Sequence, residues 1–174
     1  MTKQQLTHMW DMMRQRHGIG MRCIEAIPAD QLDSHPIPNM RTPKELVVHL
    51  YDVVIKAMVE GVLRGQIVAD ESAETKIAAG IKNRDQLLQF ARTCWNAADM
   101  SVNQITDQQL MANVSTPWDF SAPGYIMFGT TQDEYLHHRG QLYAYLRALG
   151  VAPPMLWDFA HNAPEYQPKA QAHA

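Results

Sequence analysis

Four long stretches of this sequence repeat apolar residues at the spacing of an amphipathic α-helix. They cover residues 3–27, 42–65, 83–102 and 130–150. No stretch alternates apolar and polar residues as a half-buried β-strand does, and no segment is repeated along the chain. A chain of 174 residues is long enough to enclose one full hydrophobic core. The sequence therefore predicts an all-α fold, a four-helix bundle with long connecting loops.

The second of these helices has the clearest boundary signals. Thr42 suits the N-cap, Pro43 suits the first helical position, and Glu45 completes a capping box with Thr42. Gly61 and Gly65 mark the other end. We expect one helix between these signals.

Three glycines stand inside predicted helices. Gly18 and Gly20 weaken the middle of the first helix, which predicts a kink or a break there. Gly140 lies within the last helix, where glycine costs about 1 kcal/mol relative to alanine. Its presence predicts a close approach between two helices.

Residues 112–129 are the least regular part of the chain. Pro117, Trp118, Phe120 and Pro123 interrupt the helical spacing there. We expect a loop folded over part of the bundle, which could serve as the lid of a pocket between the helices.

The last predicted helix carries three possible metal ligands on little more than one turn. Glu134 and His138 are four residues apart, so they lie one above the other on the same helix face, and His137 lies close to that face. A carboxylate and an imidazole in this arrangement can hold a divalent ion if another helix supplies a third ligand. His49, in the apolar stripe of the second helix, is the candidate.

Each of these residues also has a structural explanation. A single histidine on an apolar face is more often a core residue with a hydrogen-bond partner than a metal ligand. Burying an imidazole and a carboxylate without partners costs several kcal/mol in order of magnitude, so His49, Glu134 and His138 need a shared explanation if all face the core. A metal ion provides one and a Glu–His hydrogen bond provides another; the spacing fits both.

Arg139 follows the histidine pair directly. One interpretation is a surface salt bridge, to Asp133 or Asp52. The other is an arginine that orients a metal ligand or binds an acidic substrate.

Composition excludes several classes of partner. The formal net charge is -3 and no basic run stands out, so we expect no nucleic-acid partner. The apolar stretches are too short to span a bilayer, and the N-terminus has no apolar signal-peptide core. We therefore expect a cytoplasmic protein without a membrane partner, in which Cys23 and Cys94 are buried free thiols.

The end of the last helix resembles a known family. Residues 137–142, His-His-Arg-Gly-Gln-Leu, followed by residues 145–150, are similar to the last-helix signature of the DinB-like superfamily. These are the damage-inducible, YfiT-like metalloenzymes, not the DNA polymerase that shares the name. The resemblance covers nearly the whole chain, and its combination of motifs is specific although each piece alone is weak. It extends to residues 27–32, 41–49, 116–118 and 153–158.

The resemblance implies a bundle of the up-down-down-up type, often a homodimer, and a role in the stress response. We expect one bundle domain over residues 1–162. The remaining residues, 163–174, are rich in Ala, Gln and Pro, and we expect them to fray.

The family's metal site has three histidines, one on the second helix and two, four residues apart, on the last. They carry over to His49 and His138, while the remaining position matches Glu134, where the family usually has histidine. The departure gives a two-His-one-carboxylate site that suits one Ni, Zn, Fe or Mn ion per chain, or it weakens or abolishes metal binding. His137 is the second choice as third ligand, because it points about 100° away from His138.

Family members with assigned activities include thiol-dependent S-transferases and a maleylpyruvate isomerase, and others are called hydrolases. Their shared chemistry is a metal with open positions that binds and deprotonates a thiol or a water. For this chain we expect a metal-dependent transferase or hydrolase that acts on a small electrophile. The alternative is a non-enzymatic module with a degenerate metal site, which binds a small ligand or mediates dimer contacts.

Overall fold

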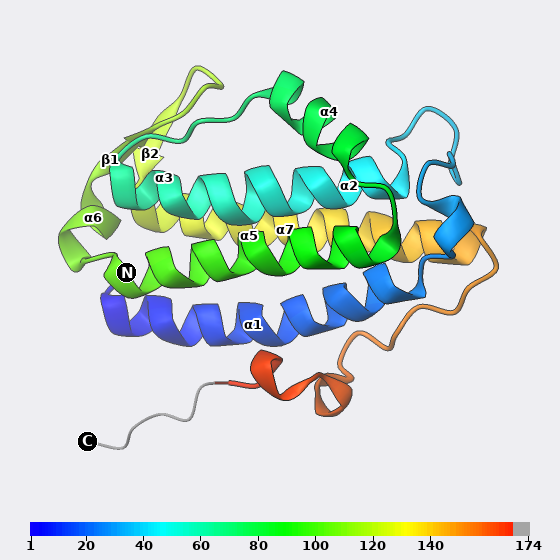
Figure 1. The fold of residues 1–174 in the computed structure, drawn as a ribbon. Helices are drawn as coiled ribbons and strands as arrows, with labels where there is room; N and C mark the ends of the chain where they lie inside the picture. Colours follow the sequence, from blue (N-terminus) through cyan, green and yellow to red (C-terminus); the bar gives the residue numbers. More distant parts are fainter. Residues whose placement is uncertain (169–174) are drawn as a thin grey trace.

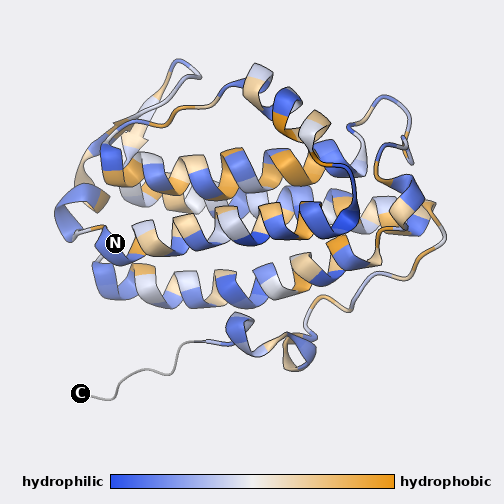
Figure 2. Ribbon diagram, in the orientation of Figure 1, coloured by the Kyte–Doolittle hydropathy of each residue, from blue (hydrophilic) through white to orange (hydrophobic). Residues whose placement is uncertain are grey.

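Four helical rods lie side by side in the computed structural model, which describes residues 1–168 (Figure 1). They are α1 (Lys3–Ala26), the rod formed by residues 43–64, α5 (Arg84–Gln104) and α7 (Gly124–Ala148). Figure 2 shows polar and apolar residues on different faces of the rods, as expected for helices that bury one face. The predicted all-α four-helix bundle is confirmed.

The rod over residues 43–64 is not a single α-helix. It consists of α2 (Pro43–His49), a π-helix, η2 (Leu50–Ala57), and α3 (Met58–Arg64). The backbone N–H of Met58 donates to the carbonyl of Val53, five residues back, instead of the α-helical four. The wider turns begin directly after His49, and π segments of this kind are frequent at functional sites.

The boundaries of this rod follow the sequence signals. The Thr42 side chain accepts a hydrogen bond from the Glu45 backbone, and the Glu45 side chain accepts one from the Thr42 backbone, so the predicted capping box is present. The rod ends at Gly65, whose φ of 80° is the left-handed conformation that glycine adopts without steric penalty.

Shorter elements connect the rods and cover part of the bundle. Helix α4 (Glu71–Gly80) packs against α2, and the α5–α7 connection holds a short helix and an antiparallel hairpin in which Val114 pairs with Ala122. The additional elements are η1 (Ala29–Gln31), α4 (Glu71–Gly80), α6 (Asp107–Met111), β1 (Asn113–Ser115), β2 (Ser121–Pro123), η3 (Phe159–His161) and η4 (Pro164–Tyr166).

Helix α7 begins at Gly124, six residues before the predicted start at Thr130. The Gly124 N–H donates to the carbonyl of Ala112, and the Gln109 carbonyl oxygen lies 2.7 Å from the place of a Cβ on Gly124. The loop expected over residues 112–129 is therefore a hairpin followed by the first turns of α7.

The helical glycines have roles other than the predicted ones. Helix α1 runs without a break through Gly18 and Gly20, and a Cβ on Gly20 would lie 2.3 Å from the Tyr135 hydroxyl. These glycines therefore allow close packing and do not break the helix. Conversely, nothing lies within 4 Å of the place of a Cβ on Gly140, so the close approach predicted there was wrong.

An aromatic cluster forms the core between α1 and α5. Trp10 stacks on Trp95 with ring centroids 4.7 Å apart and planes inclined by 5°. His17, fully buried, also stacks on Trp95, at 4.2 Å, and its Nδ1 lies 2.9 Å from the Tyr51 hydroxyl. Burial lowers the pKa of His17 well below 6.5, so the imidazole belongs to the core as a neutral group.

The C-terminal segment packs back on α1. The Asn162 side-chain amide donates to the Gln15 carbonyl at 2.8 Å, and Tyr166 of η4 is only 7% exposed. We expected residues 163–174 to fray, whereas the first part of that segment is anchored by Tyr166. Residues 169–174 lie outside the described part of the chain.

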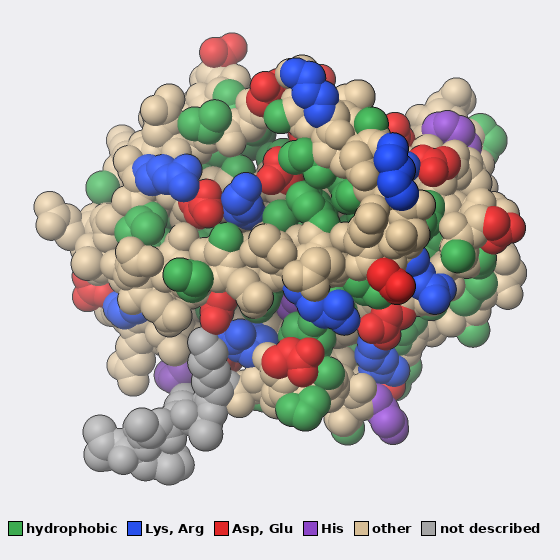
Figure 3. Space-filling view, in the orientation of Figure 1, with side chains coloured by type: hydrophobic (Ala, Val, Ile, Leu, Met, Phe, Trp, Pro, Cys, Tyr) green, Lys and Arg blue, Asp and Glu red, His purple; other side chains and the backbone are tan. Residues whose placement is uncertain are grey.

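The surface mixes both signs of charge. Figure 3 shows acidic and basic side chains interspersed on one face, which is hollowed beneath α4. Cys23 and Cys94 are buried and free, as predicted, and burial raises the pKa of each thiol to about 12. Within residues 1–168, no helix combines the length and the apolar character required to cross a bilayer.

Candidate metal centre

His49 and His138 face each other between two rods of the bundle. His49 is the last residue of α2, directly before the π-helix, and His138 lies in the middle of α7. Their ring centroids are 4.9 Å apart and the ring planes are nearly perpendicular, at 85°. The structure therefore brings together the two histidines that the sequence singled out on different helices.

Glu74 of α4 fixes the orientation of His49. The Nδ1 atom of His49 lies 2.8 Å from Oε2 of Glu74, and both side chains are largely buried. An ionised carboxylate only accepts hydrogen bonds, so Nδ1 carries the proton and donates it. Nε2 of His49 then has a free lone pair, as a metal-ligating imidazole requires.

His138 has the same arrangement on its own helix. Its Nδ1 lies 2.9 Å from Oε1 of Gln141, so Nδ1–H donates and Nε2 has the lone pair. Nε2 lies 3.4 Å from Oε2 of Glu134, so two hydrogen-bond acceptors face each other. Burial lowers the pKa of His138 and disfavours an imidazolium. A metal cation bound by both Nε2 and the carboxylate would remove the repulsion between these two acceptors.

The structure separates the two candidates for the third ligand. Glu134 lines the same cavity as His49 and reaches His138 with its carboxylate. Nε2 of His137 instead lies 3.1 Å from the side-chain nitrogen of Gln141, which donates to it. His137 therefore helps to hold the residue that orients His138, and Glu134 is the better third ligand.

The donor set fits a divalent ion in its chemistry. Two imidazole nitrogens and one carboxylate are ligands that Zn, Fe, Ni and Mn accept. Within residues 1–168, no three His, Cys, Asp or Glu side chains already stand close enough together to form a ligand cluster. The Glu134 side chain is 47% exposed. Completing the set therefore requires the three side chains to approach one another more closely.

A cavity of about 300 Å³ opens beside His49 and Glu134. Trp118 and Phe120, from the turn of the β1–β2 hairpin, form one wall, with ring centroids 6.4 Å apart and planes inclined by 21°. The predicted lid residues thus line the space next to the histidine pair. The remaining wall residues are Val53, Val54, Met58 and Thr130.

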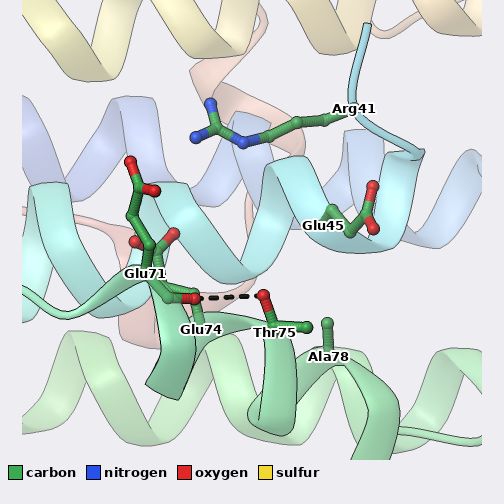
Figure 4. Close-up of a pocket in the computed structure, with 6 residues that line it drawn as sticks. All are labelled: Arg41, Glu45, Glu71, Glu74, Thr75 and Ala78. Carbon is green, nitrogen blue, oxygen red and sulfur yellow. Dashed lines mark hydrogen bonds between the residues drawn. The ribbon is translucent and has the colours of Figure 1, made fainter.

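A second cavity, of about 240 Å³, lies on the other side of Glu74 (Figure 4). It lies between α4 and the start of α2. At its edge, the Thr75 hydroxyl donates a hydrogen bond to the Glu71 carbonyl at 3.0 Å. Glu74 lines this cavity and also binds His49. Sequence analysis missed Glu74, because no spacing links α4 to the predicted helices. The lining residues are Arg41, Glu45, Glu71, Glu74, Thr75 and Ala78.

The structure contradicts the surface salt bridge considered for Arg139. It is buried, not exposed, and within residues 1–168 it forms no ion pair. Asp52 pairs with Lys56 instead, at 3.3 Å. The guanidinium group lies over the ring of Tyr143, one turn further along α7. Arg139 therefore interacts with a different part of α7 from the histidine pair.

The fold has a counterpart among solved structures. The crystal structure of YjoA, a DinB-like protein from Bacillus subtilis, superposes with a TM-score of 0.68 over 87% of this chain and 96% of that chain. The two sequences are 17% identical, so the likeness concerns the fold. No curated protein matches the sequence.

A family model gives the assignment. The model of the DinB family matches residues 1–169, nearly the whole chain. The match includes α2, with His49, and the segment of α7 that contains Glu134 and His138. The chain belongs to the DinB family.

Proposed function

We propose that this DinB-family protein binds one divalent metal ion through His49, His138 and Glu134, and acts as a thiol transferase or hydrolase on a small electrophile. The observation that carries the proposal is the matched orientation of the two imidazoles. Each has its Nδ1 engaged by an acceptor, Glu74 or Gln141, and each leaves Nε2 for a ligand. Two facing histidines with the same tautomer are typical of metal ligands.

The three ligands leave coordination positions for a reactant. When bound, a divalent ion in such a site lowers the pKa of a coordinated thiol or water, which makes either a nucleophile at neutral pH. A two-His-one-carboxylate set suits Ni, Zn, Fe or Mn.

The other residues of the site orient the metal ligands and form the walls that would contact the substrate. Glu74 holds the His49 ring and increases the basicity of its Nε2. Val53, Val54 and Met58 give the cavity an apolar wall that excludes water. Trp118 and Phe120 offer ring faces to the body of a small apolar substrate.

Elemental analysis tests the metal site. We would purify the protein without chelator and without nickel affinity resin, beside His49→Ala and His35→Ala. His35 is an exposed histidine whose Nδ1 lies 2.9 Å from the Met40 carbonyl oxygen, so it serves as the matched control. We expect about one ion per chain in the wild type and in His35→Ala, and none in His49→Ala. Equal metal content in all three proteins would refute the site.

A second candidate function is a non-enzymatic module with a degenerate metal site. It is favoured by the absence, within residues 1–168, of three ligand side chains already in place. Such a protein would bind no divalent ion at micromolar concentration. It would bind a fluorescent naphthalene sulfonate in the aromatic cavity, and Trp118→Ala would weaken that binding while His49→Ala and His138→Ala would not.

The proposal also includes a homodimer in the cytoplasm, without nucleic acid or membrane as partner. Light scattering of the purified protein at several concentrations tests the oligomeric state.

A further inference from the structure

Arg139 is a buried cation whose counter-charge is missing among residues 1–168. Only 7% of the residue is exposed, and its Nη1 is buried without a hydrogen-bond partner. No Asp or Glu of the described residues forms an ion pair with it. A guanidinium stays charged at any physiological pH, and a buried charge without a partner is strongly unfavourable.

The groups around Arg139 are themselves cations or hydrogen-bond donors. Arg16 of α1 is close enough that, after the effect of burial, the charge of Arg139 lowers its pKa. The guanidinium carbons of Arg139 and Arg147 lie 6.0 and 5.7 Å from the ring centroid of Tyr143. The Tyr143 hydroxyl is also buried; the Cys23 thiol interacts with it weakly, and no described atom lies at hydrogen-bond distance from it. Arg139 Nη1 and the Tyr143 hydroxyl are therefore two buried donors at this seam between α1 and α7 that have no acceptor among the described residues.

Asp158, which lies against α1, is already engaged by other groups. Asp158 pairs with Arg22 of α1 at 2.7 Å and also contacts His161. Arg16 and Arg139 form no ion pair with any residue between 1 and 168, and of the two only Arg139 is buried.

We propose that the seam between α1 and α7 binds a small oxyanion, a phosphate or a carboxylate group, held by Arg139, Arg16 and the Tyr143 hydroxyl. The planar fork of a guanidinium matches two oxygens of such a group, and a phenol donates to a third. An oxyanion would satisfy both orphaned donors and compensate the buried charge. This site is separate from the histidine pair, because Arg139 projects about 100° around α7 from His138.

Titration of the metal-free full chain with inorganic phosphate tests the site. We would follow heat and melting temperature at constant ionic strength, with acetate in a parallel arm to separate phosphate from carboxylate recognition. We expect binding by the wild type, and binding at least about tenfold weaker in Arg139→Gln. Tyr143→Phe should weaken it about threefold or more. Arg64→Gln, in an exposed pair with Glu60, is the matched control and should bind as the wild type does.

The anion-free melting temperature separates binding from a purely structural role. Arg139→Gln removes an uncompensated charge, so it should melt at or above the wild-type temperature without phosphate and gain nothing when phosphate is added. A variant that melts lower without anion would show that the guanidinium is structural and would overturn the proposal.

Two other outcomes would also overturn it. One is the absence of heat and of stabilisation with both phosphate and acetate. The other is a wild-type dimer that binds neither anion and that dissociates on Arg139→Gln, because an acidic side chain of a second copy would then fill the place of the anion.

Discussion

The Nδ1 atom of His49 lies 2.8 Å from Oε2 of Glu74, a residue of the short helix that packs against α2. A carboxylate at this position selects the tautomer of the imidazole and holds its ring. The carboxylate comes from α4, outside the four rods of the bundle. The position of α4 therefore determines how well His49 can serve as a ligand.

Removal of the Glu74 charge should weaken metal binding without unfolding the protein. We expect Glu74→Gln to lower the affinity for Zn by about tenfold to a hundredfold, since an outer carboxylate both orients the ligand and raises its basicity. Zn titration against a chromophoric chelator measures this. Glu71→Gln is the control, because Glu71 lines the same cavity as Glu74 without a bond to His49. Equal losses in both variants would contradict the prediction.

Substitutions of Glu134 test whether its carboxylate is the third metal ligand. We expect Glu134→Gln to weaken Zn binding by at least about tenfold, because the amide carries no charge. Glu134→His should bind at least as tightly as the wild type, since imidazole is a better Zn ligand at this spacing. Stoichiometry and affinity from the same chelator competition decide between these outcomes. An unchanged affinity in Glu134→Gln would remove Glu134 from the ligand set.

Two helical glycines should respond to alanine in opposite directions. Gly20→Ala would place a methyl group 2.3 Å from the Tyr135 hydroxyl, and overpacking of this kind costs about 1–3 kcal/mol of unfolding free energy. Gly140→Ala meets nothing within 4 Å and should stabilise the fold by about 0.5–1 kcal/mol through helix propensity. Urea denaturation of both variants measures the two changes. A gain in stability for Gly20→Ala would show that α1 packs less closely on Tyr135 than described, and a loss for Gly140→Ala would contradict the open space at that position.

His17 should make the fold sensitive to acid. Burial, with the nearby charges of Arg14 and Arg92, holds the pKa of His17 well below 6.5, whereas Asp99 opposes the shift. Because the unfolded chain binds the proton more readily, this contribution to stability is complete above about pH 6.5 and falls as the pH decreases below it, by up to about 1.4 kcal/mol per pH unit. Denaturation curves between pH 7.5 and about pH 5 should show a flatter decline in His17→Gln than in the wild type.

The His17 prediction depends on the difference between two slopes. Other carboxylates and histidines contribute equally to both proteins, so they cancel in that comparison. Parallel declines in wild type and variant would mean that His17 is protonated without loss of the fold.

The sequence predicted those parts of the molecule that depend on local spacing. The capping box at Thr42 and the pair formed by Glu134 and His138 follow from residues three or four positions apart. The facing position of His49 followed from placing two apolar stripes against one core. The spacing of apolar residues was therefore enough to predict the four rods and the facing histidines.

The residues that sequence analysis missed or misplaced depend on contacts between distant segments. Glu74 binds His49 only because α4 folds back over α2, and the spacing of residues 71–80 contains no sign of that. The burial of Arg139 depends on the rotation of α7 against α1, so its polarity suggested a surface position. Gly20 and Gly140 look alike in sequence, yet one faces Tyr135 and the other faces open space.

The π-helix after His49 determines the phase between a candidate ligand and the wall of its cavity. Its hydrogen bonds close over five residues instead of the α-helical four, so a change of residues 50–57 to α-helical winding would rotate the later side chains relative to His49. Val53 and Met58, which now share the cavity with His49, would then point to different neighbours. The winding of this segment is therefore as much a part of the site as the identity of its residues.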